Sequence, residues 1–72
     1  MKIWYCKVPR PEQIMLTFLA EAQEGLCTVS TVDQEQGILR IMATEGQETE
    51  ALEFINALKS EIGLQEVQWQ EP

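Results

Sequence analysis

The sequence has no histidine, only two cysteines and only five basic side chains in 72 residues. Histidine is the usual general base and the usual partner in catalytic triads, so its absence removes the commonest hydrolytic machinery. The cysteines, Cys6 and Cys27, are too far apart in sequence for a C-x-x-C motif and make a poor metal site. We therefore expect no catalytic residue, no metal and no cofactor, and we predict that the protein is not an enzyme.

The start of the sequence also lacks an apolar leader, because Met1 and Lys2 lead directly into a strand-like segment. We therefore expect a cytoplasmic protein whose two cysteines stay reduced and pack as small hydrophobic residues. A single disulfide between Cys6 and Cys27 is the alternative. No apolar run approaches the roughly 18 residues that a membrane span requires, so we expect no membrane partner.

Positive charge is scarce as well, because twelve acidic side chains outweigh the five basic ones and give a net charge of −7. Proteins that bind nucleic acids cluster Lys and Arg against the phosphates, and this acidic protein would be repelled by them. The same charge argues against an anionic membrane surface. We assign the acidic residues to solubility and expect no nucleic-acid partner.

A chain of 72 residues fits one domain, and we expect a single domain over residues 1–72 with an ordered core of about residues 2–69. A core of this size typically contributes only about 3–5 kcal/mol, and such domains often depend on a partner subunit. The small size therefore favours self-association.

Changes in hydrophobic periodicity divide the chain into six elements, separated by Pro9, Gly25, Gly37, Gly46 and Gly63. We predict strands at residues 2–8, 26–32, 38–44 and 65–69, helices at residues 12–24 and 47–62, and a frayed tail at residues 70–72. Asp33 and Gly37 favour a short hairpin loop between the second and third strands.

Each predicted helix carries one apolar stripe at helical spacing. The stripe of the first helix is predicted to bury Ile14, Met15, Phe18, Leu19 and Ala22. The stripe of the second is predicted to bury Ala51, Leu52, Ile55, Leu58 and Ile62.

The order β-α-β-β-α-β predicts an α+β fold of ferredoxin-like type, a two-layer sandwich. Right-handed crossovers give a four-stranded antiparallel sheet in the order 4-1-3-2, with both helices on one face. The opposite face of the sheet is then left without a helix.

Strand alternation predicts which side chains lie on that open face. Burying Arg40 in a small core would be costly, so we expect Leu39, Ile41 and Ala43 to face the helices and Arg40 to face outward. Trp4, Cys6 and Val8 face inward by the same alternation. The predicted association surface is Ile3, Tyr5, Val32, Ile38, Arg40 and Met42. We expect a homodimer through this face or through the strand edges, although apolar residues on one strand face are also ordinary surface.

Arg10 lies at the start of the first predicted helix, where free N–H groups and the helix dipole favour an anion. Arg10, Pro11 and Glu12 are therefore a candidate binding site for a small carboxylate. The alternative is that Arg10 is simply exposed to solvent.

Three short segments, Val8-Pro9, Glu24-Gly25-Leu26 and Thr31-Val32-Asp33, occur at matching places in a known group of domains. Through them nearly the whole chain resembles the ACT-like group of ferredoxin-like domains and a family of short, uncharacterised bacterial proteins. The ACT loop normally carries a Gly after its Pro, whereas Glu12 follows Pro11 here. The resemblance implies a dimeric module that binds an amino acid or similar molecule near the first loop.

Two functions follow as expectations. The first is a non-catalytic ACT-like regulatory or interaction module that self-associates. The second is a sensor of an amino acid or another small carboxylate at the first strand-helix loop.

Overall fold

The computed structural model describes residues 2–71 and has the six elements in the predicted order. They are β1 (Ile3–Lys7), α1 (Arg10–Ala22), β2 (Cys27–Asp33), β3 (Ile38–Ala43), α2 (Glu48–Glu61) and β4 (Gln65–Val67). Met1 and Pro72, which belong to the predicted domain and tail, lie outside the described residues. Among residues 2–71 there is no helix with both the length and the apolar character needed to cross a membrane.

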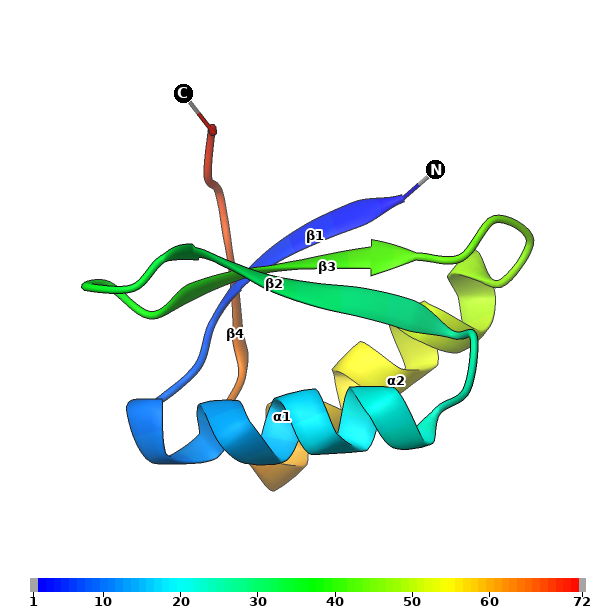
Figure 1. Cartoon of the computed structure of the whole chain (residues 1–72), viewed down its shortest axis with the longest axis horizontal. Helices are drawn as coiled ribbons and strands as arrows, with labels where there is room; N and C mark the ends of the chain where they lie inside the picture. Colours follow the sequence, from blue (N-terminus) through cyan, green and yellow to red (C-terminus); the bar gives the residue numbers. More distant parts are fainter. Residues whose placement is uncertain (1, 72) are drawn as a thin grey trace.

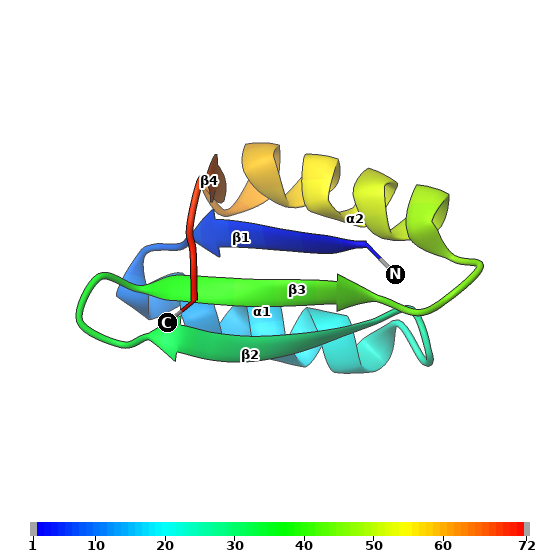
Figure 2. The same ribbon diagram turned by 90° about the horizontal axis from the view of Figure 1, so that it is seen from above.

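The four strands form one antiparallel sheet in the order β2-β3-β1-β4, and both helices lie on the same side of it (Figures 1 and 2). The predicted ferredoxin-like α+β fold and its strand order are therefore confirmed. The two central strands, β1 and β3, carry most of the core of the sheet. Trp4, Cys6 and Val8 are buried as predicted, and so are Leu39, Ile41 and Ala43 on β3.

Helix α1 buries a different face from the one that its apolar spacing suggested. Leu16 is fully buried and Ala20 is 5% exposed, whereas Ile14 is 82% exposed and Phe18 is 68% exposed. Met15 is exposed too, and only Leu19 of the predicted stripe packs against the core. The predicted stripe is therefore wrong.

A contact at the start of α1 accompanies this rotation. The helix begins at Arg10, directly after Pro9, and the side-chain Nε2 of Gln13 donates a hydrogen bond to the Val8 carbonyl at 3.1 Å. Residues three and seven positions after Gln13 share its side of the helix. Leu16 and Ala20 therefore face the sheet, and the larger side chains between them face away.

Helix α2 follows the prediction more closely. Ala51, Ile55 and Leu58 are buried and Ile62 packs against the core. Leu52 is a correction, because it is 40% exposed. Its neighbour Ala51 takes the core-facing position, and adjacent residues of a helix point about 100° apart.

The hairpin between β2 and β3 has the chemistry that its sequence predicted. The backbone N–H of Gln36 donates to Asp33 Oδ1 at 2.9 Å, and Gly37 has a φ of +71°. The Val8 N–H donates to the Gly37 carbonyl at 3.3 Å, which joins the hairpin to the loop after β1. The turn therefore sits beside the start of α1.

The C-terminal segment departs from the prediction. β4 ends at Val67 rather than at Trp69, and the following residues leave the sheet edge. Figure 2 shows this tail passing over β1 and β3 on the side away from the helices, and Figure 1 shows it rising from that side. The described part of the predicted frayed tail thus crosses the open face of the sheet.

Candidate functional site

The open face of the sheet carries one row of side chains that runs across all four strands. Tyr5 on β1 lies opposite Arg40 on β3 and opposite Val67 on β4, and Arg40 lies opposite Ser30 on β2. The phenol of Tyr5 and the guanidinium of Arg40 are therefore neighbours at the middle of the sheet.

Five of the six residues of the predicted association surface keep some exposure. Ile3 is 41% exposed, and Tyr5, Val32, Arg40 and Met42 are half-buried. Ile38 is a correction, because it is only 3% exposed. It is the first residue of β3, and Figure 2 shows the tail passing over that part of the strand.

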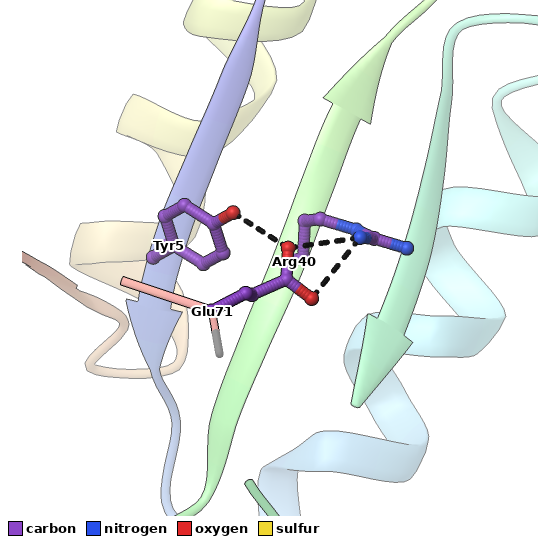
Figure 3. A network of polar contacts seen from close by, with 3 residues as sticks. All are labelled: Tyr5, Arg40 and Glu71. Atoms are coloured by element: carbon purple, nitrogen blue, oxygen red, sulfur yellow. Dashed lines mark hydrogen bonds and ion pairs between the residues drawn. The ribbon is translucent and has the colours of Figure 1, made fainter. Parts of the chain in front are cut away.

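The tail is fixed to this face through one carboxylate. Tyr5 donates its hydroxyl to Glu71 Oε2 at 2.8 Å, and Arg40 Nη1 contacts the two carboxylate oxygens at 3.0 and 3.2 Å (Figure 3). Tyr5 and Arg40 come from neighbouring strands, and the segment after β4 brings Glu71 to both of them. Sequence alternation placed Tyr5 and Arg40 on this face but gave no sign of Glu71, which is 31 residues from Arg40 along the chain.

The contacts shift the pKa values of Glu71 and Tyr5 in the directions expected when Glu71 is ionised and Tyr5 is protonated. The hydrogen bond from Tyr5, followed by the charge and hydrogen bond of Arg40, lowers the pKa of Glu71 below its ordinary value. The same hydrogen bond raises the pKa of Tyr5, so its hydroxyl remains a donor. Because the contact lowers the pKa of Glu71, its full stabilising effect is present above the ordinary pKa of a glutamate side chain. The effect is lost as the pH falls through the lowered pKa of Glu71.

Among residues 68–71 of the tail, Trp69 is the one that is partly withdrawn from solvent. Trp69 is half-buried, with its indole Nε1 out of contact with solvent and without a hydrogen-bond partner in the described structure, while Gln68 and Gln70 are exposed. Residues 68–71 form no backbone hydrogen bond to other described residues. This alternation is that of an extended segment which turns every second side chain toward the sheet.

A cleft of about 260 Å³ lies where the β1-α1 loop meets the β2-β3 hairpin and the start of β4. Its polar lining includes Lys7, Arg10 and Gln13, and Gly37 and Glu35 come from the hairpin. Of the three residues predicted to bind a carboxylate, Arg10 lines the cleft, whereas Pro11 and Glu12 do not. The Glu12 N–H donates to the Pro9 carbonyl at 2.8 Å, which uses that amide to begin the helix.

The rotation of α1 exposes an apolar row that the sequence interpretation had assigned to the core. Ile14 and Phe18, one helical turn apart, line a groove of about 400 Å³ together with Thr31 of β2 and Leu39 of β3. Met15 adds a third exposed apolar side chain to this helix. We call Ile14, Met15 and Phe18 the α1 apolar row.

The two cysteines do not come together. Cys6 is paired with Leu39 and Cys27 with Ala43, on opposite sides of β3 and four positions apart along it. Strands lie about 4.8 Å apart, so two residues separated by a whole strand are beyond the reach of a disulfide. Burial, followed by the charge of Glu66, raises the pKa of Cys6 to about 11, and burial also raises that of Cys27. Both thiols are free, and residues 2–71 contain no group of three or more acidic or cysteine side chains arranged to hold a metal ion.

Comparison with known proteins gives one match. A family model described as a domain of unknown function, DUF4911, matches residues 6–62, which reach from β1 to just beyond the end of α2. The searches of curated proteins and of solved structures gave no match. The matched region contains the cleft loop and the α1 apolar row, and it ends before β4 and the tail.

Proposed function

The chain is a member of DUF4911, a family described as a domain of unknown function, and from its surface we propose that it is a non-catalytic interaction module that self-associates. The α1 apolar row beside the unpaired edge of β2 carries the proposal. The resemblance to dimeric ACT-like regulatory modules points the same way, and the two free thiols accord with a cytoplasmic location.

The α1 apolar row gathers three large apolar side chains on the outer side of one helix. Ile14 is 82% exposed and Phe18 is 68% exposed, so most of each apolar side chain meets solvent in the monomer. Neighbouring exposed apolar side chains of this size mark protein association sites. Aromatic side chains such as Phe18 are also enriched at the centre of such interfaces.

Strand β2 offers a second element of the same surface. It has seven residues, lies at one edge of the sheet beside the groove of α1, and has no partner strand on its outer side within residues 2–71 (Figure 2). Long edge strands without Lys or Pro pair readily with another strand. An antiparallel pairing of two copies around Ser30 keeps the two Asp33 carboxylates at opposite ends and brings both α1 helices to one side.

The net charge of −7 on each copy opposes this association. Salt screens repulsion between exposed charges with a Debye length of about 8 Å at physiological ionic strength. The dimer is therefore expected to become tighter as the salt concentration rises, because its contacts are apolar and backbone rather than ionic.

We expect Phe18→Ser to weaken dimer formation by about tenfold or more, as removal of a central aromatic anchor does in other interfaces. Because Phe18 is 68% exposed, the change should leave the monomer folded. Sedimentation equilibrium over a range of protein concentrations measures the dimer constant, and circular dichroism checks the fold.

The matched control is Leu52→Ser, which removes an apolar side chain of 40% exposure from the other helix. It should leave the dimer constant unchanged. A wild-type chain that stays monomeric at millimolar concentration, or a Phe18→Ser chain that dimerises as well as the wild type, would contradict the proposal.

The cleft supports a second candidate function, binding of an amino acid or another small carboxylate. Lys7 and Arg10 supply positive charge to a space of about 260 Å³, which suits a molecule of that size, and Gln13 supplies an amide. The cleft is formed at the loop where the ACT resemblance implies a ligand.

A thermal-shift screen of amino acids and small carboxylates tests this second function. A ligand at a hundred times its dissociation constant stabilises by about 2.7 kcal/mol, which raises the melting temperature of a domain of this size by about 10–20 °C. The shift should disappear in Arg10→Ala and persist in Lys2→Ala, whose cation does not line the cleft. Equal shifts in both variants would place the ligand elsewhere.

A further inference from the structure

The contact between the tail and the open sheet face has the form of a ligand in a binding site. One acidic residue from a segment that belongs to no helix or strand is held by two side chains of the central strands, Tyr5 and Arg40. We propose that the open sheet face is a binding site for an acidic peptide of a partner protein, and that residues 68–71 are an intramolecular ligand that occupies it. This site is separate from the β2 edge and the α1 apolar row.

The receptor side of the contact supplies hydrogen-bond donors that suit a carboxylate. Arg40 Nη1 reaches both oxygens of Glu71, and the Tyr5 hydroxyl reaches one of them at 2.8 Å. Hydrogen bonds with an ionised partner are stronger than neutral ones. With a net charge of −7, this domain places one of its five basic side chains at the centre of the face, where it attracts acidic segments that the rest of the surface repels.

The tail also shows what else the ligand should contain. Trp69 lies two positions before Glu71, so an extended segment turns both side chains to the same side. The indole nitrogen of Trp69 is shielded from solvent while its neighbours Gln68 and Gln70 are exposed. A matching partner segment therefore has an aromatic residue two positions before its acidic residue.

Two features make the tail displaceable. Its backbone is not hydrogen-bonded to the other described residues, and the Arg40–Glu71 pair remains about one-third exposed on both sides. In addition, the tail crosses only the C-terminal end of β1 (Figure 2), whereas Ile3, which is 41% exposed, and the half-buried Met42 opposite it lie at the other end of that strand. A longer segment from a partner can cover this apolar end as well, which the tail does not do.

The test uses the 72-residue chain and a fluorescent peptide with the sequence of residues 67–72, Val-Gln-Trp-Gln-Glu-Pro. Glu71→Gln weakens the intramolecular ligand without touching the receptor side chains. Because a tethered ligand competes at millimolar effective concentration, we expect the Glu71→Gln chain to bind the peptide about fivefold or more tighter than the wild type does, as measured by fluorescence anisotropy.

Two further arms fix the chemistry of the site. Replacing the peptide's Glu by Gln should weaken binding to the Glu71→Gln chain several-fold, and this arm leaves the protein itself unaltered. The double variant Glu71→Gln/Arg40→Gln should also bind the unmodified peptide several-fold more weakly than the Glu71→Gln chain does. Circular dichroism checks that this variant is folded.

Several results would overturn the proposal. They are equal affinity of the wild-type and Glu71→Gln chains, no detectable binding by either chain at about millimolar peptide, and equal binding of the Glu and Gln peptides. Competition by N-acetylglutamate as strong as that by the peptide would instead assign the site to small carboxylates and overturn the peptide assignment. None of these results depends on the dimer constant, so the self-association proposal is tested separately.

Discussion

Replacing Leu16 by Ala is expected to lower the free energy of unfolding by about 2–5 kcal/mol. Leu16 is fully buried at the centre of α1, and its removal leaves a cavity between the helix and the sheet. Because the core of so small a domain supplies only about 3–5 kcal/mol, much of the variant should be unfolded at 25 °C. Urea denaturation followed by circular dichroism measures the loss.

Phe18→Ala is the matched control on the same helix. It removes a larger apolar side chain, but one that is 68% exposed, so under conditions where the protein is monomeric its cost should stay within about 0.5 kcal/mol. A cost for Phe18→Ala that equals or exceeds that of Leu16→Ala would show that α1 packs with the face that its apolar spacing suggested. The pair of variants therefore tests the rotation of this helix directly.

Replacing Gly37 by Ala is expected to be the second most damaging change. A Cβ at this position would lie 3.0 Å from Gln13 Nε2 and 3.2 Å from the Val8 carbonyl oxygen, at a φ of +71°. The positive φ alone costs an L-residue about 1–2 kcal/mol. The close approach adds to this cost, because the hydrogen bond between Gln13 and Val8 has to shift.

Gly46→Ala separates the two effects. Gly46 has a φ of +87°, but beyond the glycine and its two chain neighbours no heavy atom lies within 4 Å of the position of an added Cβ. Its replacement should cost only the conformational part, about 1–2 kcal/mol. Thermal unfolding of the two variants should therefore place Gly37→Ala below Gly46→Ala, and the opposite order would mean that the hairpin is not packed against the loop after β1.

Local sequence signals were sufficient to predict the structure wherever one residue type satisfies one requirement of the backbone. Pro9 ends the first strand, Asp33 bonds the hairpin backbone, and Gly37 takes the positive φ of the turn. Strand alternation placed Cys6 and Ile41 in the core and Arg40 outside, because an unpaired charge in a small core is costly. These signals act over a few residues, so neither helix packing nor the C-terminal tail was needed to interpret them.

Helix α1 shows where such signals fail. Its sequence offers two apolar faces, one through Ile14 and Phe18 and one through Leu16 and Ala20, and both have helical spacing. The hydrogen bond from Gln13 to the Val8 carbonyl accompanies the second choice. Spacing alone could not select it, because the rotation of a helix depends on how its first turn is attached to the sheet.

The sequence by itself determined the order of the elements, the two-layer fold and the strand order, because periodicity, turn residues and the handedness of crossovers allow few other arrangements. It also placed Tyr5 and Arg40 on the open face of the sheet and Arg10 at the first strand-helix loop. Only the tertiary structure decided which face of α1 is buried and that Glu71 reaches Tyr5 and Arg40 across the open sheet. Both outcomes depend on contacts between segments that are distant along the chain or meet at a loop, and no local pattern encodes such contacts.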